Sequence, residues 1–136
     1  MFKLITAALF ALVLTILPAH ASKRMFKGNY DGIAQLENVV GDRIFYSPVR
    51  FNVNKTGKIT GTAYNDATQK LLKVSGKIKK VKSLFGIRFI AQASGTFSDG
   101  TKWTAEVEAN KGVTAKIISG KARKGKYSGS VSLTNL

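Results

Sequence analysis

The sequence predicts an all-β protein, a single small antiparallel meander of about eight strands that closes into an up-and-down β-barrel. Three observations carry this prediction. Apolar and polar residues alternate with a period of two along most of the chain after the first 21 residues, which is the pattern of a strand with one buried face. Turn-forming residues separate the alternating segments at short intervals. The 136 residues include 13 Gly and only 2 Pro, which suits strands joined by tight turns.

Residues 1–21 are predicted to be a cleavable secretory signal peptide. Lys3 gives the start of the chain a positive charge, residues 4–17 are apolar except for Thr, and a Pro precedes the small-x-small sequence at 19–21. A transmembrane anchor is the alternative, but this apolar run would span only about 21 Å as a helix, less than a hydrocarbon core of roughly 30 Å. Cleavage after Ala21 would leave residues 22–136 as a single β-barrel domain, exported to the periplasm or the extracellular medium.

The first four strands are expected between turn signals rich in Gly, Asn and Asp. These signals lie at residues 41–42, 55–57 and 65–66. The fourth segment shows the alternation directly, because every second residue from Leu72 to Ile78 is apolar or Gly and the residues between are Lys or Ser. The predicted strands cover residues 28–40, 43–54, 58–65 and 70–81.

The last four strands follow the same pattern. Every second residue is apolar or Gly within 87–93, 103–109 and 127–133, so Ile87 and Trp103 are assigned to the buried face. Turn signals lie at residues 99–100, 111–112 and 124–125. The predicted strands cover residues 86–97, 101–109, 113–123 and 126–135.

Closure into a barrel is favoured over a β-sandwich of the same strands, because closure leaves no exposed edge. The apolar face mixes bulky residues with Gly and Ala, as the interior of a small barrel requires. These small residues would leave room for a small apolar ligand near Trp103, Phe89 and Ala91, unless neighbouring Phe, Leu, Ile and Val side chains fill the space.

The composition excludes several chemistries. With no Cys in the chain, disulfides, Cys-ligated metals and thiol catalysis are absent. The only His is His20, which would leave with the signal peptide. The nucleophile elbow, the phosphate-binding loop and the zinc-binding helix motif are all missing. Glu106 and Glu108 are spaced like a glycosidase pair, but both are expected to face solvent without a cleft. We therefore expect no catalytic residues, no cofactor and no metal.

The charge is strongly positive and is predicted to be unevenly distributed. The net charge of +15 would become +14 once Lys3 is removed. Successive turns of a meander lie at alternating ends, so Asp42, Asp66 and Asp99 share one end with the basic residues of turn 123–126. The opposite end, called the basic pole below, gathers nine basic residues and no acidic residue in its turns. The basic pole comprises Lys23, Arg24, Lys27, Lys55, Lys58, Lys79, Lys80, Lys82 and Lys111.

Such a pole predicts a polyanionic partner: lipopolysaccharide, anionic lipid headgroups or acidic polysaccharide. The competing interpretation is that the charge only keeps an exported protein soluble. Nucleic acid is less favoured, because single-strand binders expose stacking aromatics and only Tyr64 is expected to be exposed here.

Three other functions are considered. The first is a carrier or sensor of a small ligand in the barrel interior. The second is a structural or adhesive component of the cell envelope. The third is an outer-membrane barrel, in which the apolar face would meet lipid. Much of the positive charge would then line a narrow lumen, where unpaired cations are costly. The sequence is therefore compatible with contact at a membrane surface, but we do not expect the barrel to span a membrane. The sequence does not predict an oligomeric state.

Overall fold

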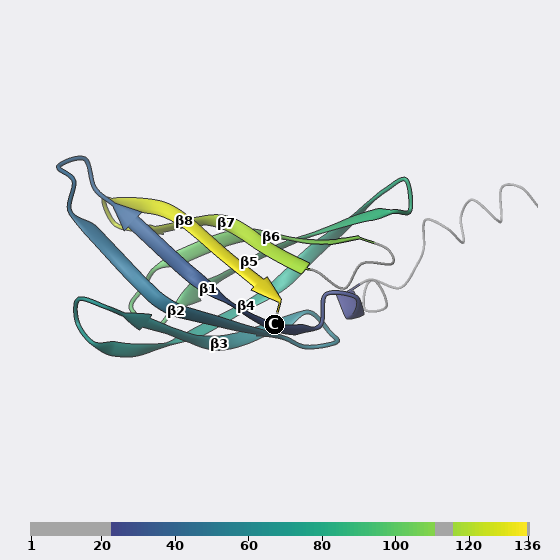
Figure 1. Ribbon diagram of the computed structural model, residues 1–136, viewed down its shortest axis with the longest axis horizontal. Helices are drawn as coiled ribbons and strands as arrows, with labels where there is room; N and C mark the ends of the chain where they lie inside the picture. The colour runs from purple at the N-terminus through teal and green to yellow at the C-terminus, as the bar shows by residue number, and fades with distance from the viewer. Residues whose placement is uncertain (1–22, 111–115, 136) are drawn as a thin grey trace, which may run out of the picture.

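The fold is a closed barrel of eight antiparallel strands. The computed structural model describes residues 23–110 and 116–135, and the predicted signal peptide lies outside the described residues. The strands pair in the order in which they occur in the chain, and β1 pairs with both β2 and β8 (Figure 1). The predicted up-and-down barrel is thus confirmed, and the strands do not form a sandwich.

The strand bounds differ from the predicted ones mainly at the turns. The strands are β1 Gly28–Glu37, β2 Arg43–Val53, β3 Lys58–Asn65, β4 Lys70–Leu84, β5 Arg88–Phe97, β6 Lys102–Asn110, β7 Lys116–Lys124 and β8 Tyr127–Asn135. β1 ends before residue 40 because Oδ1 of Asn38 accepts the backbone N–H groups of Val40 and Asp42, at 3.2 and 2.9 Å, and so shapes the turn. Residues 113–115 of the predicted seventh strand lie outside the described residues.

Apolar side chains fill the interior, and Trp103 is the largest of those fully buried. Its indole ring lies over one glycine of β4 and one of β5: a Cβ on Gly76 or on Gly95 would come within 2.5 Å of Cζ2 of Trp103. The ring centroid of Phe51 lies 4.8 Å from that of Trp103. The predicted mixture of bulky and very small inner residues is therefore present, and here the small residues accommodate a large neighbour.

A short helical turn at the N-terminal end of the described chain plugs one end of the barrel. Phe26 is fully buried, and its carbonyl accepts a 2.6 Å hydrogen bond from the hydroxyl of Tyr30. The carbonyl of Lys27 accepts a 2.7 Å hydrogen bond from Nζ of Lys116 on β7. The sequence pattern did not predict this plug, which fixes the backbone from which the N-terminal cations project.

β4 is the longest strand and contains a β-bulge. Ile78 pairs with Ala93 and Lys80 with Gln92, so Lys79 is an extra residue without a partner on β5. Before the bulge Ile78 faces the interior, and after it Val81 is the half-buried residue while Lys80 and Lys82 are exposed. The bulge therefore keeps successive lysines on the outer face of one strand.

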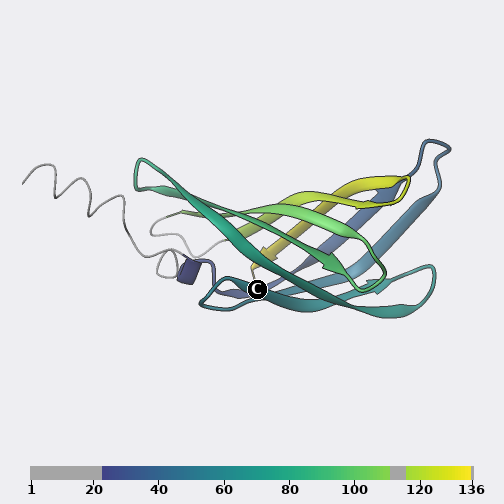
Figure 2. The same cartoon turned by 180° about the vertical axis from the view of Figure 1, so that it is seen from behind.

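The β4–β5 hairpin extends past the neighbouring strand ends (Figures 1 and 2). β4 continues to Leu84, beyond the predicted end at residue 81, and β5 begins at Arg88 instead of residue 86. The assignment of Ile87 to the buried face is wrong: Ile87 lies in the turn and is 64% exposed, because this part of the hairpin projects beyond the core. Tyr64, expected to be exposed, is half-buried.

Candidate functional site: the basic pole

Three separate segments lie at the plugged end of the barrel. These are the N-terminal turn, the β2–β3 turn at residues 54–57 and the β4–β5 hairpin (Figure 2). The backbone N–H of Ile78 on β4 donates a 2.8 Å hydrogen bond to the carbonyl of Gly57. A Cβ on Gly57 would lie 2.8 Å from Cδ of Lys23, so the N-terminal turn packs directly on the β2–β3 turn. These contacts bring the N-terminal turn and the β2–β3 turn together beside Ile78, and the rest of the β4–β5 hairpin projects away from them at the same end (Figure 2).

The cations of the basic pole are mostly in contact with solvent. Lys23 is half-buried, and Lys111 lies outside the described residues. The remaining seven residues are exposed: Arg24, Lys27, Lys55, Lys58, Lys79, Lys80 and Lys82. Their long side chains can therefore reach a partner without rearrangement of the fold.

Within residues 23–110 and 116–135, no ion pair involves a member of the basic pole. The four ion pairs of these ranges are Arg43–Glu37 at 3.9 Å, Arg50–Asp31 at 3.8 Å, Arg88–Glu108 at 2.6 Å and Lys124–Asp99 at 3.4 Å. Three carboxylates are thus engaged with arginines and a fourth with Lys124, and none with a member of the basic pole. The lysines of the basic pole keep their charge available for an external anion.

One acidic residue lies nearer to the basic pole than the count of turn residues indicated. Glu108, two residues before the end of β6, binds Arg88 on the neighbouring strand β5. The contact is bidentate, with Nε–Oε1 at 2.6 Å and Nη2–Oε2 at 3.0 Å. Because the two charges cancel, the pair leaves the net charge of this end positive.

The opposite end of the barrel holds Asp99 in a hydrogen-bonded cluster. Tyr46 donates its hydroxyl to Oδ2 of Asp99 at 2.7 Å, and the backbone N–H of Thr101 donates to Oδ1 at 3.0 Å. Burial raises the pKa of Asp99, but hydrogen bonds from Tyr46 and Thr101 and the charge of Lys124 outweigh it, so the pKa lies below its ordinary value. Burial raises the pKa of Tyr46 well above its usual range, so its hydroxyl stays protonated.

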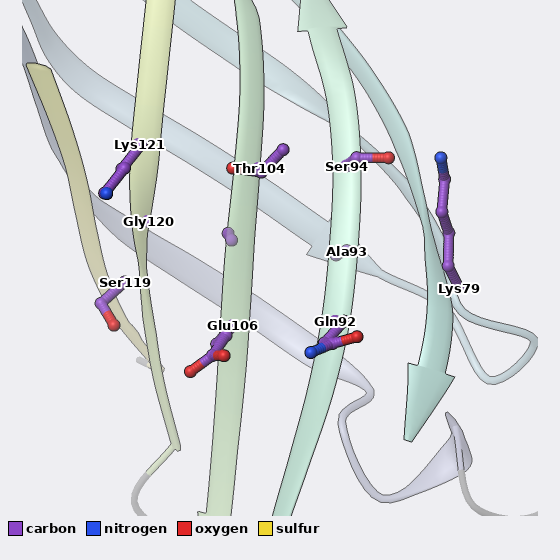
Figure 3. Close-up of a pocket in the computed structure, with 10 residues that line it drawn as sticks. Lys79, Gln92, Ala93, Ser94, Thr104, Glu106, Ser119, Gly120 and Lys121 are labelled. Atoms are coloured by element: carbon purple, nitrogen blue, oxygen red, sulfur yellow. The ribbon is translucent and has the colours of Figure 1, made fainter. Parts of the chain in front are cut away.

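An open groove of about 650 Å³ runs across the outer face of β4 to β7, beside the basic pole. Figure 3 shows Lys79 on β4 and Lys121 on β7 at its two sides, with Glu106 on β6 between them. The remaining lining side chains are small or uncharged: Gln92, Ala93, Ser94, Thr104, Ala105, Ser119 and Gly120. Glu106 is the single carboxylate among the residues that line the groove. Glu108, which is paired with Arg88, does not line it.

The three residues predicted to surround an interior ligand do not form one cluster. Trp103 pairs with Gly95, whereas Phe89 pairs with Ala109, six residues further along β6, which is about 20 Å in an extended strand. Ala91 is fully buried and Phe89 is half-buried. Nε1 of Trp103 is buried without a hydrogen-bond partner among the described residues.

Besides the position of Glu108, sequence reasoning missed two features of this end. The first is Phe26, whose burial anchors Lys23, Arg24 and Lys27. The second is the exposed apolar tip of the β4–β5 hairpin, where Phe85 is almost fully exposed. A Phe between basic residues and a Leu-Phe-Gly-Ile run between two strands were the available signals.

Comparisons with protein-family models, with curated proteins and with solved structures gave no match to this chain. None of the helical segments in residues 23–110 and 116–135 is long and apolar enough to cross a membrane. The same ranges contain no group of three His, Asp or Glu side chains that could hold a metal ion.

Proposed function

We propose that this protein is an exported, non-enzymatic β-barrel that binds an anionic surface or polymer through its basic pole. Lipopolysaccharide, anionic lipid and acidic polysaccharide carry the chemistry that such a surface recognises. One observation carries the proposal: exposed cations from three segments gather at one end, and none of those described is paired with a carboxylate. Generic solubilising charge would not need to be concentrated in this way.

The orientation of the side chains supports a barrel whose outer wall faces water. Large apolar residues such as Trp103, Phe51 and Leu36 are buried inside. The outward positions of β6, by contrast, carry Lys102, Thr104 and the two glutamates. An outer-membrane barrel has the reverse arrangement, with an apolar band outside and polar residues in the lumen. The basic pole would then meet its partner from solution.

The test compares two triple charge reversals that change the net charge equally. Reversing Lys79, Lys80 and Lys82 to Glu removes three cations of the basic pole. The control reverses three exposed lysines outside the pole: Lys73, Lys102 and Lys126. Binding to anionic vesicles, lipopolysaccharide and an acidic polysaccharide is measured at low and near-physiological salt, because exposed charges are screened within about 8 Å at 0.15 M.

We expect the pole variant to bind at least about 100-fold more weakly, since a lysine near an anionic surface contributes about 1 kcal/mol. The control should retain most of the affinity. Equal losses in the two variants would show that only diffuse charge matters, and the proposal would then be abandoned.

A small-ligand carrier is the second candidate, and the buried, unpartnered Nε1 of Trp103 is the observation that favours it. A ligand acceptor atom beside this nitrogen would satisfy its hydrogen bond. Native mass spectrometry of the purified protein tests this candidate directly. A mass equal to that of the chain alone, in protein taken from its own cell envelope, would count against it.

A further inference from the structure

The tip of the β4–β5 hairpin exposes a cluster of large apolar side chains. Leu84, Phe85 and Ile87 are 40%, 97% and 64% exposed. They lie at the far end of the longest strand of the barrel, on the part that projects past the neighbouring strand ends (Figure 1). Exposed apolar residues that gather at one projecting point commonly mark an interaction site.

Phe85 occupies a backbone conformation that its side chain disfavours. Its φ is +56° and that of Gly86 is +66°, and the carbonyl of Leu84 accepts a 3.2 Å hydrogen bond from the N–H of Ile87. Two consecutive left-handed residues make a type I′ turn, for which Asn-Gly and Asp-Gly are the favoured sequences. Since Phe85 is almost fully exposed, no packing within the barrel compensates for the unfavourable φ. Asn at this position would satisfy the turn better and expose less apolar surface.

Two lysines of β4 lie behind the apolar tip, at increasing distances from Phe85 along the strand. Lys82 lies three residues before Phe85, about 10 Å along an extended strand, and Lys80 lies about 17 Å behind it. An apolar group that binds at the surface of a bilayer is buried roughly 5–10 Å into the boundary between headgroups and acyl chains. With Phe85 at that depth, Lys82 reaches the headgroup layer and Lys80 stays close above it.

We propose that this hairpin anchors the protein to the surface of an anionic lipid bilayer, with Leu84, Phe85 and Ile87 inserted at the acyl boundary and the lysines of β4 on the headgroups. The inference rests on the proposed function and narrows the class of polyanionic partner to a lipid bilayer. A soluble polysaccharide or nucleic acid would use the lysines, but neither has an apolar phase to receive the tip. Charge and apolar surface together fit an anionic membrane.

The turn at the opposite end of the barrel provides a natural contrast. Val39 and Val40 in the β1–β2 turn are also highly exposed, at 100% and 78%. However, Glu37 and Asp42 flank them, and an anionic surface repels carboxylates. Leu71, 66% exposed near the start of β4, has Lys70 and Lys73 beside it, but it is a single side chain. Exposed apolar residues therefore occur at both ends, and the β4–β5 tip differs from the other turns in gathering three of them ahead of the lysines of β4.

Protection of a free strand edge is the competing explanation for these lysines. β3 begins at Lys58, which pairs with Lys77, so β4 has no partner from β3 beyond that point. Lysines and bulges are common devices that block pairing between exposed edges. This explanation accounts for Lys79, Lys80 and Lys82, but it leaves the exposed Phe85 as an unexplained liability.

The experiment expresses the full chain, purifies the exported protein and compares Phe85→Asn with Val39→Asn. Because both variants keep the same N-terminus, any contribution of the leading apolar segment cancels. The probes are vesicles of phosphatidylcholine with 30% phosphatidylglycerol, vesicles of phosphatidylcholine alone, and heparin as a soluble polyanion. Thermal unfolding checks the fold, and Phe85→Asn should be at least as stable as the parent because Asn tolerates the left-handed region.

We expect Phe85→Asn to reduce partitioning onto the anionic vesicles by about tenfold or more, as the loss of one inserted aromatic side chain predicts. Val39→Asn should partition like the parent, and heparin binding should be the same for all three proteins. A Phe85→Trp variant adds a positional readout. Its emission should shift to the blue on anionic vesicles and be quenched by brominated acyl chains, while the buried Trp103 contributes an unchanged background.

The outcomes separate this inference from the proposed function. If no anionic probe binds the parent protein, the proposed function fails, and the anchor fails with it. If vesicles and heparin bind but Phe85→Asn binds vesicles like the parent, the basic pole stands and the anchor is refuted. Loss of heparin binding in Phe85→Asn would also overturn it, in favour of a site for a soluble polymer. A further variant replaces Lys79, Lys80 and Lys82 together with Gln. If this variant aggregates but still binds vesicles, the lysines protect the strand edge, and their proposed contact with the headgroups is overturned.

Discussion

Replacing Gly95 with Ala should destabilise the barrel by about 3 kcal/mol, although the change adds a single methyl group. Gly95 lies on β5 opposite Gly76 of β4, next to the indole of Trp103. A Cβ on Gly95 would lie 1.9 Å from the carbonyl oxygen of Ser75, 2.5 Å from Cζ2 of Trp103 and 2.7 Å from Cα of Gly76. Two of these three atoms belong to the backbone and cannot rotate away.

The magnitude follows from the movement that the new methyl group would force. Relieving the contact with Ser75 requires the two strands to separate locally by at least about 1 Å, which stretches a ladder hydrogen bond of about 2.9 Å beyond the bonding range. Losing about two such bonds costs roughly 1–3 kcal/mol, and displacing the indole of Trp103 adds an overpacking penalty of similar size. Together these costs amount to roughly 2–6 kcal/mol. We take about 3 kcal/mol, from the lower half of this range, which corresponds to a fall in Tm of roughly 10 °C for a domain of this size.

The assay is thermal and urea unfolding of the parent and of two variants. Ser94→Ala is the matched control, because Ser94 is the preceding residue of β5 and its side chain lines the outer groove. It should change stability by less than about 0.5 kcal/mol. A change of about 1 kcal/mol shifts the Tm of such a domain by a few degrees. A Tm for Gly95→Ala within about 2 °C of the parent would therefore refute the close approach of β4 and β5. Rescue by Trp103→Phe would assign the strain to the indole instead of the backbone.

The remaining predictions concern the two ends of the barrel. Phe26→Ala should cost about 3–5 kcal/mol in urea unfolding and should also weaken vesicle binding, because the cations next to the plug lose their anchor. Tyr30→Phe removes the hydrogen bond to the carbonyl of Phe26 and should cost about 1 kcal/mol. The pKa of Asp99 is lowered in the folded state, so its contribution to stability is present above the unfolded pKa of about 3.9 and is lost as the pH falls through the folded pKa. Asp99→Asn should therefore be less stable at pH 7 and show a shallower loss of Tm below pH 4.

The strands were predictable because burial in a barrel acts on every second residue. From Trp103 to Ala109, each inward position is apolar and buried, and each outward position of this segment is polar. Closure of the barrel left no comparable local mark, since the pairing of β1 with β8 joins residues such as Gly32 and Leu133, a hundred positions apart. It followed only indirectly, from the number of strands and from the need to protect edges.

The basic pole could be predicted as a set of residues but not as a surface. The alternation of turns between the two ends placed Lys55 and Lys80 correctly at one end. The plug formed by Phe26 could not be found this way, because a single helical turn has too few residues to show a period. Glu108 was missed because its strand end, and not a turn, brings it beside Arg88.

The turn at the hairpin tip could not be predicted from the sequence, because its residues are not the ones that usually form such a turn. A Leu-Phe-Gly-Ile run resembles core sequence, and Phe-Gly lacks the Asn or Asp that usually signals a type I′ turn. A readable signal did exist in the consecutive Lys79 and Lys80: they break the alternation after Ile78, and the inner register resumes at Val81. An interruption of this kind indicates a β-bulge.

The positive-φ turns show why the β4–β5 tip stands apart among the described turns. In the β3–β4 turn a positive φ falls on Gln69, whose polar side chain suits exposure to water. In the β1–β2 turn the exposed residues Val39 and Val40 do not have a positive φ, which falls on Gly41 instead. Phe85 alone combines an unfavourable φ with an exposed aromatic ring. Local rules tend to be broken where function requires it. In the anchor that we propose, a bilayer surface would bury this ring and so supply the compensation that the barrel itself does not provide.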